Sequence, residues 1–175
     1  YVFFRDRVMG PADALAHVSD SIYIDGLLTE KVIRDIKKLK KTKKPFFLTA
    51  GFISPHLPFN APKKYWDLYD RNTIKQPENY NYIPKDAPEI SISSWPEMRS
   101  YTNIPGQGPV SDSIAIDLIH GYYATISYTD ALVGKILNAL KEEGLENNTI
   151  VILVSDHGYN LQEHTQWTKF TNYNT

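Results

Sequence analysis

The 175-residue chain contains 42% hydrophobic and 22% charged residues, which is the composition of a folded globular domain with a real core. Its formal net charge of −1 argues against a protein that binds nucleic acid mainly through charge. The lack of cysteine excludes disulfides, thiolate metal sites and cysteine nucleophiles within this sequence, and no apolar run approaches the roughly 20 residues that span a bilayer.

The first element that the sequence predicts is an amphipathic helix over residues 27–40. Its apolar side chains recur at three- and four-residue spacing, as Leu27, Leu28, Val32, Ile33, Ile36 and Leu39. Lysines crowd the helix and its exit, up to Lys44. Such a basic run could bind a polyanion, but we interpret it as a solvated face whose cations favour the C-terminal end of the helix.

A buried strand is predicted over residues 46–53, where a continuous apolar run follows Pro45. The prolines within residues 54–62 then exclude a helix and the interior of a sheet. His56 lies between two of them, in a loop stiff enough to position an acid or a donor to an anion. Taken alone, His56 is interpreted as an incidental surface histidine. A short helix over residues 63–69 is expected to begin at Pro62.

A long irregular segment, rich in proline, asparagine, serine and tyrosine, follows over residues 71–111. Loops of this length are uncommon in compact domains and are often functional. The strongest helical pattern covers residues 113–143, and Gly144 fits the position just past its end. His17 and His120 are expected to serve packing or the surface.

The second predicted strand, residues 149–155, leads into the most informative motif. Its apolar run ends at Val154 and is followed at once by Ser155, Asp156, His157 and Gly158. A carboxylate beside an imidazole at the carboxyl end of a strand is typical either of a polar turn or of half a metal site.

The order helix, strand, loop, helix, strand predicts an α/β fold, mainly a parallel sheet covered by helices. If the two strands are neighbours, His56, Asp156 and His157 converge at one edge of the sheet. Further polar and aromatic side chains follow on the same edge, namely Glu163, His164, Trp167 and Lys169. Lysines are common, so Lys169 alone does not indicate a site.

Two segments carry a resemblance to a known family. They are residues 44–59, KPFFLTAGFISPHLPF, and residues 154–169, VSDHGYNLQEHTQWTK. In this order, with residues 122–130 between them, they resemble the sulfatase family, and within it the iduronate-2-sulfatase type. The resemblance covers the chain from about Asp20 onward. It implies an alkaline-phosphatase-like α/β fold and the hydrolysis of sulfate esters on a sulfated glycan such as a glycosaminoglycan.

The resemblance also implies roles for individual residues. Asp156 and His157 match two ligands of the family's divalent cation, usually calcium. His56 matches the histidine that contacts the sulfate group and assists the leaving oxygen, and Lys169 matches the lysine that binds the sulfate. Tyr159 falls where the family lines its substrate pocket. Calcium prefers oxygen ligands and imidazole suits softer metals, but the family accepts histidine here, so calcium remains the expectation.

The sequence also departs from the family. The family's formylglycine nucleophile arises from a Cys/Ser-x-Pro-x-Arg motif with two aspartate ligands before it, and neither feature is present here. The family places both upstream. We therefore expect residues 1–175 to be part of a catalytic domain, without its N-terminal nucleophile region and its C-terminal region, and inactive alone. Gln162 and Thr165 stand where the family often has glycine. The resemblance implies a periplasmic, secreted or lysosomal protein, although the sequence shows no signal peptide.

Two alternatives stay open. One is a phosphate or phosphonate ester hydrolase of the same superfamily, with an upstream serine or threonine nucleophile; the sequence of residues 54–58 speaks against it. The other is a non-catalytic, glycan-binding relative that uses the basic helix and the Tyr/Pro-rich loop. Salt-sensitive heparin binding that survives loss of His56 and Lys169 would support this second alternative.

Overall fold

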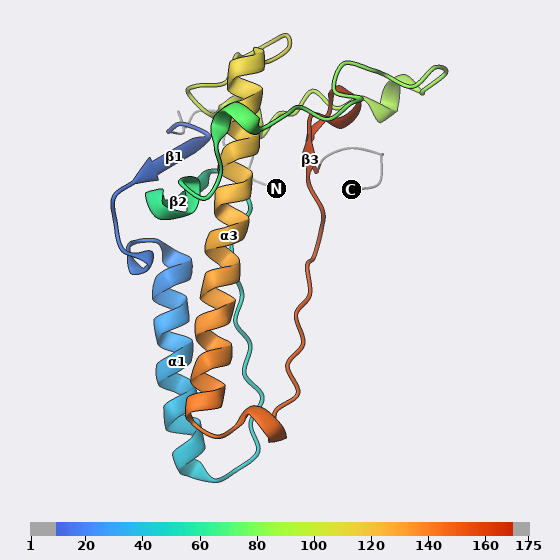
Figure 1. The fold of residues 1–175 in the computed structure, drawn as a ribbon. Helices are drawn as coiled ribbons and strands as arrows, with labels where there is room; N and C mark the ends of the chain where they lie inside the picture. Colours follow the sequence, from blue (N-terminus) through green and yellow to red (C-terminus); the bar gives the residue numbers. More distant parts are fainter. Residues whose placement is uncertain (1–9, 170–175) are drawn as a thin grey trace.

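Two long helices lie side by side in the computed structural model of the chain, which describes residues 10–169 (Figure 1). The helices α1 (Ile24–Thr42) and α3 (Asp112–Glu142) run in the same direction and pack through a buried cluster of Val32, Ile36, Ala139 and Leu140. Residues 1–9 and 170–175 lie outside the described residues. No helix within residues 10–169 is long and apolar enough to cross a membrane.

Both long helices confirm the predicted ones, with bounds that differ by a few residues. The N-terminus of α3 is capped by Ser111, whose hydroxyl accepts a hydrogen bond from the N–H of Ile114 at 3.3 Å. Just past its C-terminus, Gly144 has a φ of 67° and donates its N–H to the carbonyl of Lys141 at 2.9 Å. Glycine adopts this left-handed conformation without strain, so the predicted helix end is confirmed.

A short parallel pair of strands lies beside the upper part of α3. The strand β1 (Asp13–Ala16) pairs with β2 (Phe59–Pro62), which leads directly into the short helix α2 (Lys63–Trp66). No period in residues 1–20 predicted β1, and α2 ends before the predicted residue 69. Gly121 of α3 lies so close to these elements that a Cβ there would be 2.9 Å from Trp66 and 3.0 Å from Phe59.

A buried carboxylate ties these elements together. The side chain of Asp20, in the 3-10 turn η1 (Asp20–Ile22), is 8% exposed and lies 2.7 Å from Nζ of Lys64 and 2.5 Å from Nζ of Lys135. It also accepts a hydrogen bond from the hydroxyl of Tyr65 at 3.0 Å. Burial opposes the charge of Asp20, but the two lysines and Tyr65 outweigh burial and lower the pKa of this carboxyl. Charge pairing therefore joins η1 to α2 and α3.

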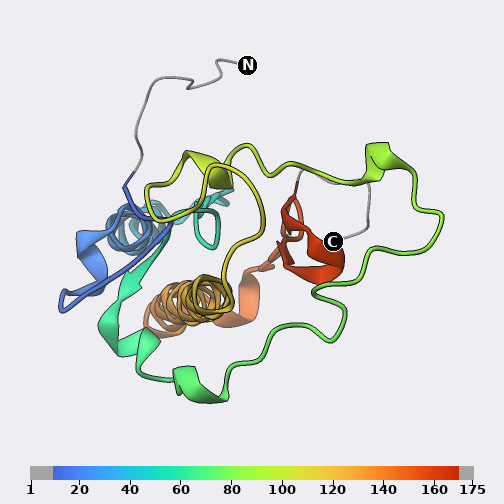
Figure 2. The same cartoon turned by 90° about the horizontal axis from the view of Figure 1, so that it is seen from above.

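The long segment 71–111 is irregular, as predicted, and it reaches the C-terminal hairpin (Figure 2). The hairpin consists of β3 (Asn160–Leu161) and β4 (Trp167–Thr168), which pair antiparallel. The side-chain oxygen of Gln166 accepts a hydrogen bond from the N–H of Ser93 at 2.8 Å. The remaining elements are short 3-10 turns: η2 (Arg71–Thr73), η3 (Glu89–Ser91), η4 (Met98–Ser100), η5 (Glu146–Asn148) and η6 (Glu163–Thr165).

The two predicted buried strands are extended but unpaired, and this corrects the expected sheet. Residues 46–53 and 150–154 both run back along the helices in the same direction (Figure 1), but no ladder of backbone hydrogen bonds joins either to another described residue. Phe47 is 91% exposed and Ile150 is 90% exposed. A strand is stabilised by its neighbours, and residues 10–169 place no strand beside either segment. The α/β order and the parallel direction are observed, whereas the only parallel sheet in this part of the chain is β1–β2.

Candidate functional site

The loop that carries His56 is fixed at both ends. The buried carboxylate of Asp25, in the first turn of α1, accepts hydrogen bonds from the N–H of Ile53 at 3.0 Å and of Ser54 at 2.8 Å. The N–H of His56 donates to the carbonyl of Ile53 at 3.0 Å. Beyond the loop, Phe59 is buried in the core. The His56 side chain is therefore presented from a backbone that side-chain bonds and core packing hold in place.

Both ring nitrogens of His56 face oxygen acceptors. Nδ1 lies 2.8 Å from the carbonyl oxygen of Leu57, and Nε2 lies 3.1 Å from Oε1 of Glu97. A carbonyl oxygen only accepts hydrogen bonds, so Nδ1 donates to Leu57, and a proton on Nε2 would be donated to the carboxylate of Glu97. The side chain is 32% exposed, which leaves the ring within reach of a ligand.

Tyr159 packs against Phe59, which directly follows the His56 loop. Its ring stacks on Tyr122, with centroids 5.6 Å apart, and meets Phe59 edge-on at 5.7 Å. Burial, followed by the negative charge of Glu97, raises the pKa of the Tyr159 phenol, which keeps it protonated. Its hydroxyl is buried and makes no hydrogen bond to another described residue. Glu97 thus links the surroundings of Tyr159 to those of His56.

Asp156 and His157 lie exposed after the extended segment 150–154. Nδ1 of His157 lies 2.8 Å from the carbonyl oxygen of Gly158 and therefore donates to it, which places the lone pair of the neutral ring on Nε2. Metal-binding histidines commonly have their second nitrogen bonded in this way. One carboxylate and one imidazole fit part of a divalent-cation shell. Across residues 10–169, however, no three His, Cys, Asp or Glu side chains gather as a metal site, so further ligands would have to come from elsewhere.

Lys169 is half-buried just after β4, and no hydrogen bond or ion pair joins its side chain to another described residue. The other polar side chains expected at this edge stabilise the hairpin loop. Glu163 accepts a hydrogen bond from the N–H of Leu161 at 2.6 Å, and Nδ1 of His164 donates to the carbonyl of Tyr82 at 3.0 Å. Trp167 is part of the buried core rather than of an open site.

The structure brings some of the expected site residues together and leaves others apart. Glu97 contacts His56 and its charge acts on Tyr159, whereas no hydrogen bond or ion pair among the described residues joins Asp156 or Lys169 to either residue. The convergence of the loops at the edge of a sheet therefore remains a prediction for Asp156, His157 and Lys169, as do the roles of all five residues.

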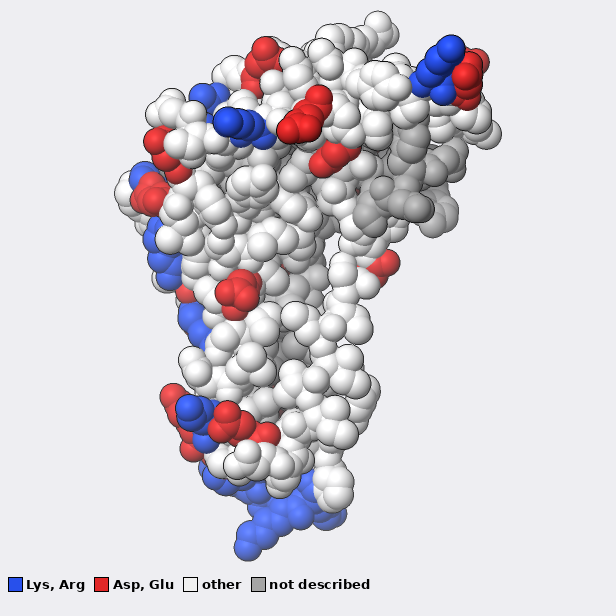
Figure 3. All heavy atoms as spheres, turned by 45° about the vertical axis from the view of Figure 1, so that its right-hand side comes forward, with Lys and Arg blue, Asp and Glu red and all other residues white. Residues whose placement is uncertain are grey.

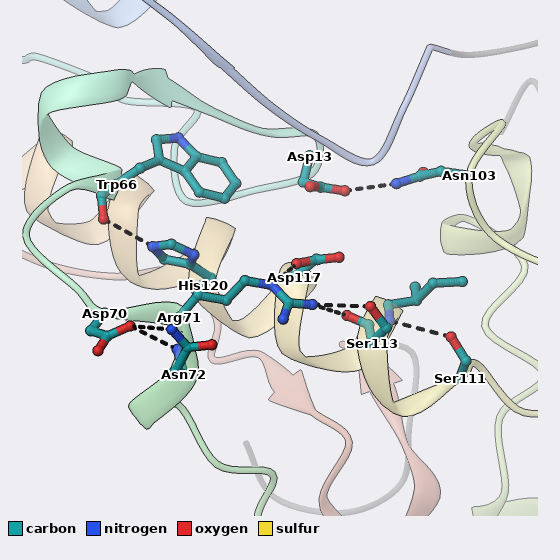
Figure 4. Close-up of polar contacts among 11 residues, drawn as sticks. Asp13, Trp66, Asp70, Arg71, Asn72, Asn103, Ser111, Ser113, Asp117 and His120 are labelled. Atoms are coloured by element: carbon teal, nitrogen blue, oxygen red, sulfur yellow. Dashed lines mark hydrogen bonds and ion pairs between the residues drawn. The ribbon is translucent and has the colours of Figure 1, made fainter.

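The remaining histidines have the packing and surface roles predicted for them. Nε2 of His120 lies 2.9 Å from the carbonyl oxygen of Trp66, and its ring meets the Trp66 ring at 4.9 Å (Figure 4). Beside it, Arg71 is bonded to Asp117 at 2.5 Å and to the hydroxyl of Ser113 at 3.0 Å. His17 is exposed. These side chains stabilise the packing of α3 or face solvent.

The lysines at the end of α1 gather at one end of the molecule (Figure 3). The exposed members are Lys37, Lys38, Lys40, Lys41, Lys43 and Lys44. Lys38 lies 3.7 Å from Asp35, and Lys40 lies 3.4 Å from Glu143, which directly follows α3. Exposure with some surface ion pairs fits the solvated face that the sequence indicates.

Sequence reasoning missed two residues that hold the His56 loop in place. In the sequence, Asp25 indicated only the start of a helix. In the structure, its carboxylate bonds to Ile53 and Ser54, which lie in a distant part of the chain. Glu97 lies within the irregular segment 71–111, where no periodicity or motif distinguishes it from the other carboxylates. No local signal in the sequence could have found either contact.

The hairpin loop has a left-handed backbone at Gln162 and Thr165, the two positions where the sulfatase family often has glycine. The φ angle is 86° at Gln162 and 65° at Thr165, a conformation that strains a β-branched residue such as threonine. We expect Thr165→Gly to raise the free energy of unfolding by about 1 kcal/mol, measured by urea denaturation. The matched control, Thr149→Gly, removes a threonine with a φ of −121° and should lower it by about 0.5–1 kcal/mol. Equal destabilisation by the two changes would contradict the strain at Thr165.

Comparisons with known proteins agree on one family. The family model described as Sulfatase matches residues 6–175. Iduronate 2-sulfatase of Mus musculus is 32% identical over 173 residues, which cover 95% of this chain and 31% of that protein. A sulfatase of Formosa agariphila is 35% identical over 132 residues, or 74% of this chain and 25% of that protein. An arylsulfatase of Clostridium perfringens is 30% identical over 135 residues, or 77% and 26%. The chain thus spans at most 31% of the length of these relatives.

Proposed function

Because the chain belongs to the sulfatase family, we propose that the full-length protein containing it hydrolyses sulfate esters. The observation that carries this proposal is the family match, which runs through both the His56 loop and the Asp156-His157-Gly158 motif. A sulfate ester carries a spread negative charge and a poor alkoxide leaving group. Its hydrolysis therefore needs positive charge at the sulfuryl oxygens and a proton for the leaving oxygen.

The residues of this chain fit those needs. His56, whose two ring nitrogens face oxygen acceptors, would donate the proton to the leaving oxygen. Lys169 would bind the sulfate group, and Tyr159 would line the pocket for the substrate. Asp156 and His157 would hold a divalent cation, which we propose to be calcium and which supplies positive charge at the sulfuryl oxygens when bound. The nucleophile, a formylglycine, would come from upstream of these residues.

We further propose a sulfated glycan such as a glycosaminoglycan as the substrate. The support is the 32% identity to iduronate 2-sulfatases of Mus musculus and Homo sapiens, which extends over 95% of this chain in both cases. The aryl- and choline-sulfatases that also match cover less of it, at 77% and 74%. A protein acting on such glycans would be periplasmic, secreted or lysosomal.

The test is to express the full-length reading frame and assay it against a sulfated disaccharide, an aryl sulfate and the matching aryl phosphate. We expect turnover of both sulfate esters, slower turnover of the phosphate, and loss of activity with a chelator that calcium restores. Faster turnover of the phosphate would refute the proposal. The 175-residue chain itself, assayed in parallel, is expected to be inactive.

The phosphate or phosphonate ester hydrolase remains the second candidate because one relative supports it. A multifunctional alkaline phosphatase superfamily protein of Trinickia caryophylli is 26% identical over 168 residues, or 90% of this chain. The non-catalytic glycan-binding alternative is supported only by the lysines at the end of α1 (Figure 3). Turnover in the assay above would remove this last alternative.

A further inference from the structure

The contact between His56 and Glu97 goes beyond the roles that the family match suggests. Nε2 of His56 and Oε1 of Glu97 are 3.1 Å apart, and both side chains are partly buried, at 32% and 24% exposed. Burial lowers the local dielectric, so an ion pair here is stronger than one on the open surface. The two residues are distant in the sequence, but their neighbours Leu57 and Met98 belong to the same buried core cluster, which brings the two loops together.

Glu97 is held where it is by contacts that do not involve His56. The guanidinium of Arg99 lies 4.2 Å from the centre of the Trp95 ring and donates hydrogen bonds to the carbonyls of Pro105 at 2.7 Å and Gly108 at 2.8 Å. Met98 is buried beside it. The position of the segment around Glu97 therefore does not depend on His56. We infer that Glu97 determines the orientation of the His56 ring, and not the reverse.

The second oxygen of Glu97 is also informative. Oε2 is buried and has no hydrogen-bond partner among the described residues, and the nearby Tyr159 hydroxyl is in the same condition. Unsatisfied buried polar atoms are costly and call for an explanation. Burial, and to a smaller extent the negative charge of Glu97, raises the pKa of Tyr101 to about 12. The carboxylate of Glu97 thus lies in a partly apolar place, where the His56 ring is its polar partner.

We propose that Glu97 is a positioning residue that keeps Nε2 of His56 protonated and fixes the orientation of the ring. The proposal rests on the sulfatase function proposed above. Because Nδ1 stays bonded to the carbonyl of Leu57, Nε2 is the nitrogen that gives up its proton. In the reacting complex this N–H is shared between Oε1 of Glu97 and the leaving oxygen. As the upstream nucleophile bonds to the sulfur and the S–O bond to the sugar breaks, the proton moves to the leaving oxygen and the ring becomes neutral. The lone pair then faces the carboxylate of Glu97, which favours reprotonation from solvent.

Few other charged or titratable groups lie near enough to His56 to keep its Nε2 protonated. Besides Glu97, the carboxylate of Asp25 lies behind the loop, where it is bonded to the backbone of Ile53 and Ser54. The phenols of Tyr101 and Tyr159 lie around Glu97 and are kept neutral by burial. Glu97 is therefore the one carboxylate within residues 10–169 that contacts the His56 ring in an ion pair.

The test uses Glu97→Gln in the full-length protein with two substrates that differ in leaving group. An aryl sulfate releases a stable phenolate and needs little protonation, whereas a sugar sulfate releases an alkoxide that needs a proton. We expect kcat on the sugar sulfate to fall about tenfold or more, with KM and aryl sulfate turnover nearly unchanged. Glu97→Asp should restore part of the rate. Glu89→Gln, an exposed carboxylate in η3, is the control and should change neither rate.

Equal loss on both substrates would overturn the proposal, because it would mark a merely structural role, and so would unchanged kinetics. A readout independent of activity is the rate at which diethyl pyrocarbonate acylates His56 at neutral pH, followed by peptide mapping. This reagent attacks unprotonated imidazole, so labelling should be several-fold faster in Glu97→Gln than in the parent, and equal rates would contradict the contact. If the parent hydrolyses no sulfate ester while labelling still responds to Glu97, the proposed function fails and the ion pair stands.

Discussion

Replacing His56 by alanine is expected to lower kcat of the full-length protein on a sugar sulfate by about 10²–10⁴-fold, the usual contribution of a positioned general acid. The alanine variant lacks any group that could protonate the leaving alkoxide from this loop. KM should change much less, because the sulfate group would still be bound by Lys169 and the cation. The measurement is steady-state kinetics on the sugar sulfate, with circular dichroism to confirm that the variant is folded.

His17→Ala is the matched control, since His17 is exposed and belongs to no site, and it should leave kcat unchanged. The double variant His56→Ala with Glu97→Gln adds a sharper criterion. If Glu97 acts through His56, the double variant should be no slower than His56→Ala alone, because groups that act as a unit are not additive. A loss of less than tenfold in His56→Ala would contradict the role of this histidine.

The helices could be predicted because their signal is local. Apolar residues at three- and four-residue spacing specify which face is buried, and this gave both long helices to within a few residues of the observed bounds. Gly144 was predictable for the same reason, since a left-handed residue after a helix favours glycine regardless of what surrounds it. By contrast, β1 was missed, because a four-residue strand with no clear alternation has no such local signal.

The candidate site could be predicted only in part. Two local motifs indicated His56, Asp156 and His157, because the residue types and spacing within each motif can be read from the sequence. Glu97 contacts His56 across 41 positions of the chain, and Asp25 bonds to Ser54 across 29. Contacts of this kind depend on how irregular segments fold over one another, which no periodicity encodes. They became visible only in the structure.

The extended segments at 46–53 and 150–154 show the opposite outcome, since buried strands were predicted and the structure shows unpaired extended segments with exposed side chains such as Phe47 and Ile150. A continuous apolar run predicts that side chains on both faces are buried, but Ile150–Val154 are exposed on both faces. The backbone groups of residues 150–154 have no hydrogen-bond partner among the described residues, although the chain there already has the extended conformation that pairing requires. We infer that both segments are strands of a parallel sheet whose other strands come from the remainder of the full-length protein.

This inference predicts that Ile152→Asp has different effects in two contexts. In the 175-residue chain, where Ile152 is 79% exposed, the change should alter the free energy of unfolding by no more than about 0.5 kcal/mol. In the full-length protein, the aspartate would be buried between strands and covering helices without a partner. There it should cost about 3 kcal/mol or more, seen as a fall of several degrees in Tm or as loss of soluble protein.

The contrast between the two contexts carries the test, because a single measurement cannot separate burial from a general effect of the new charge. Leu68→Asp provides the control: Leu68 is 64% exposed, follows α2 and belongs to neither extended segment, so the substitution should be mild in both contexts. If the full-length protein tolerates Ile152→Asp as well as it tolerates Leu68→Asp, residues 150–154 are not a buried strand. Asp156 and His157 would then not lie at the edge of a sheet. Their pairing with a cation depends on that edge, so the same result would remove the structural basis for the proposed metal site.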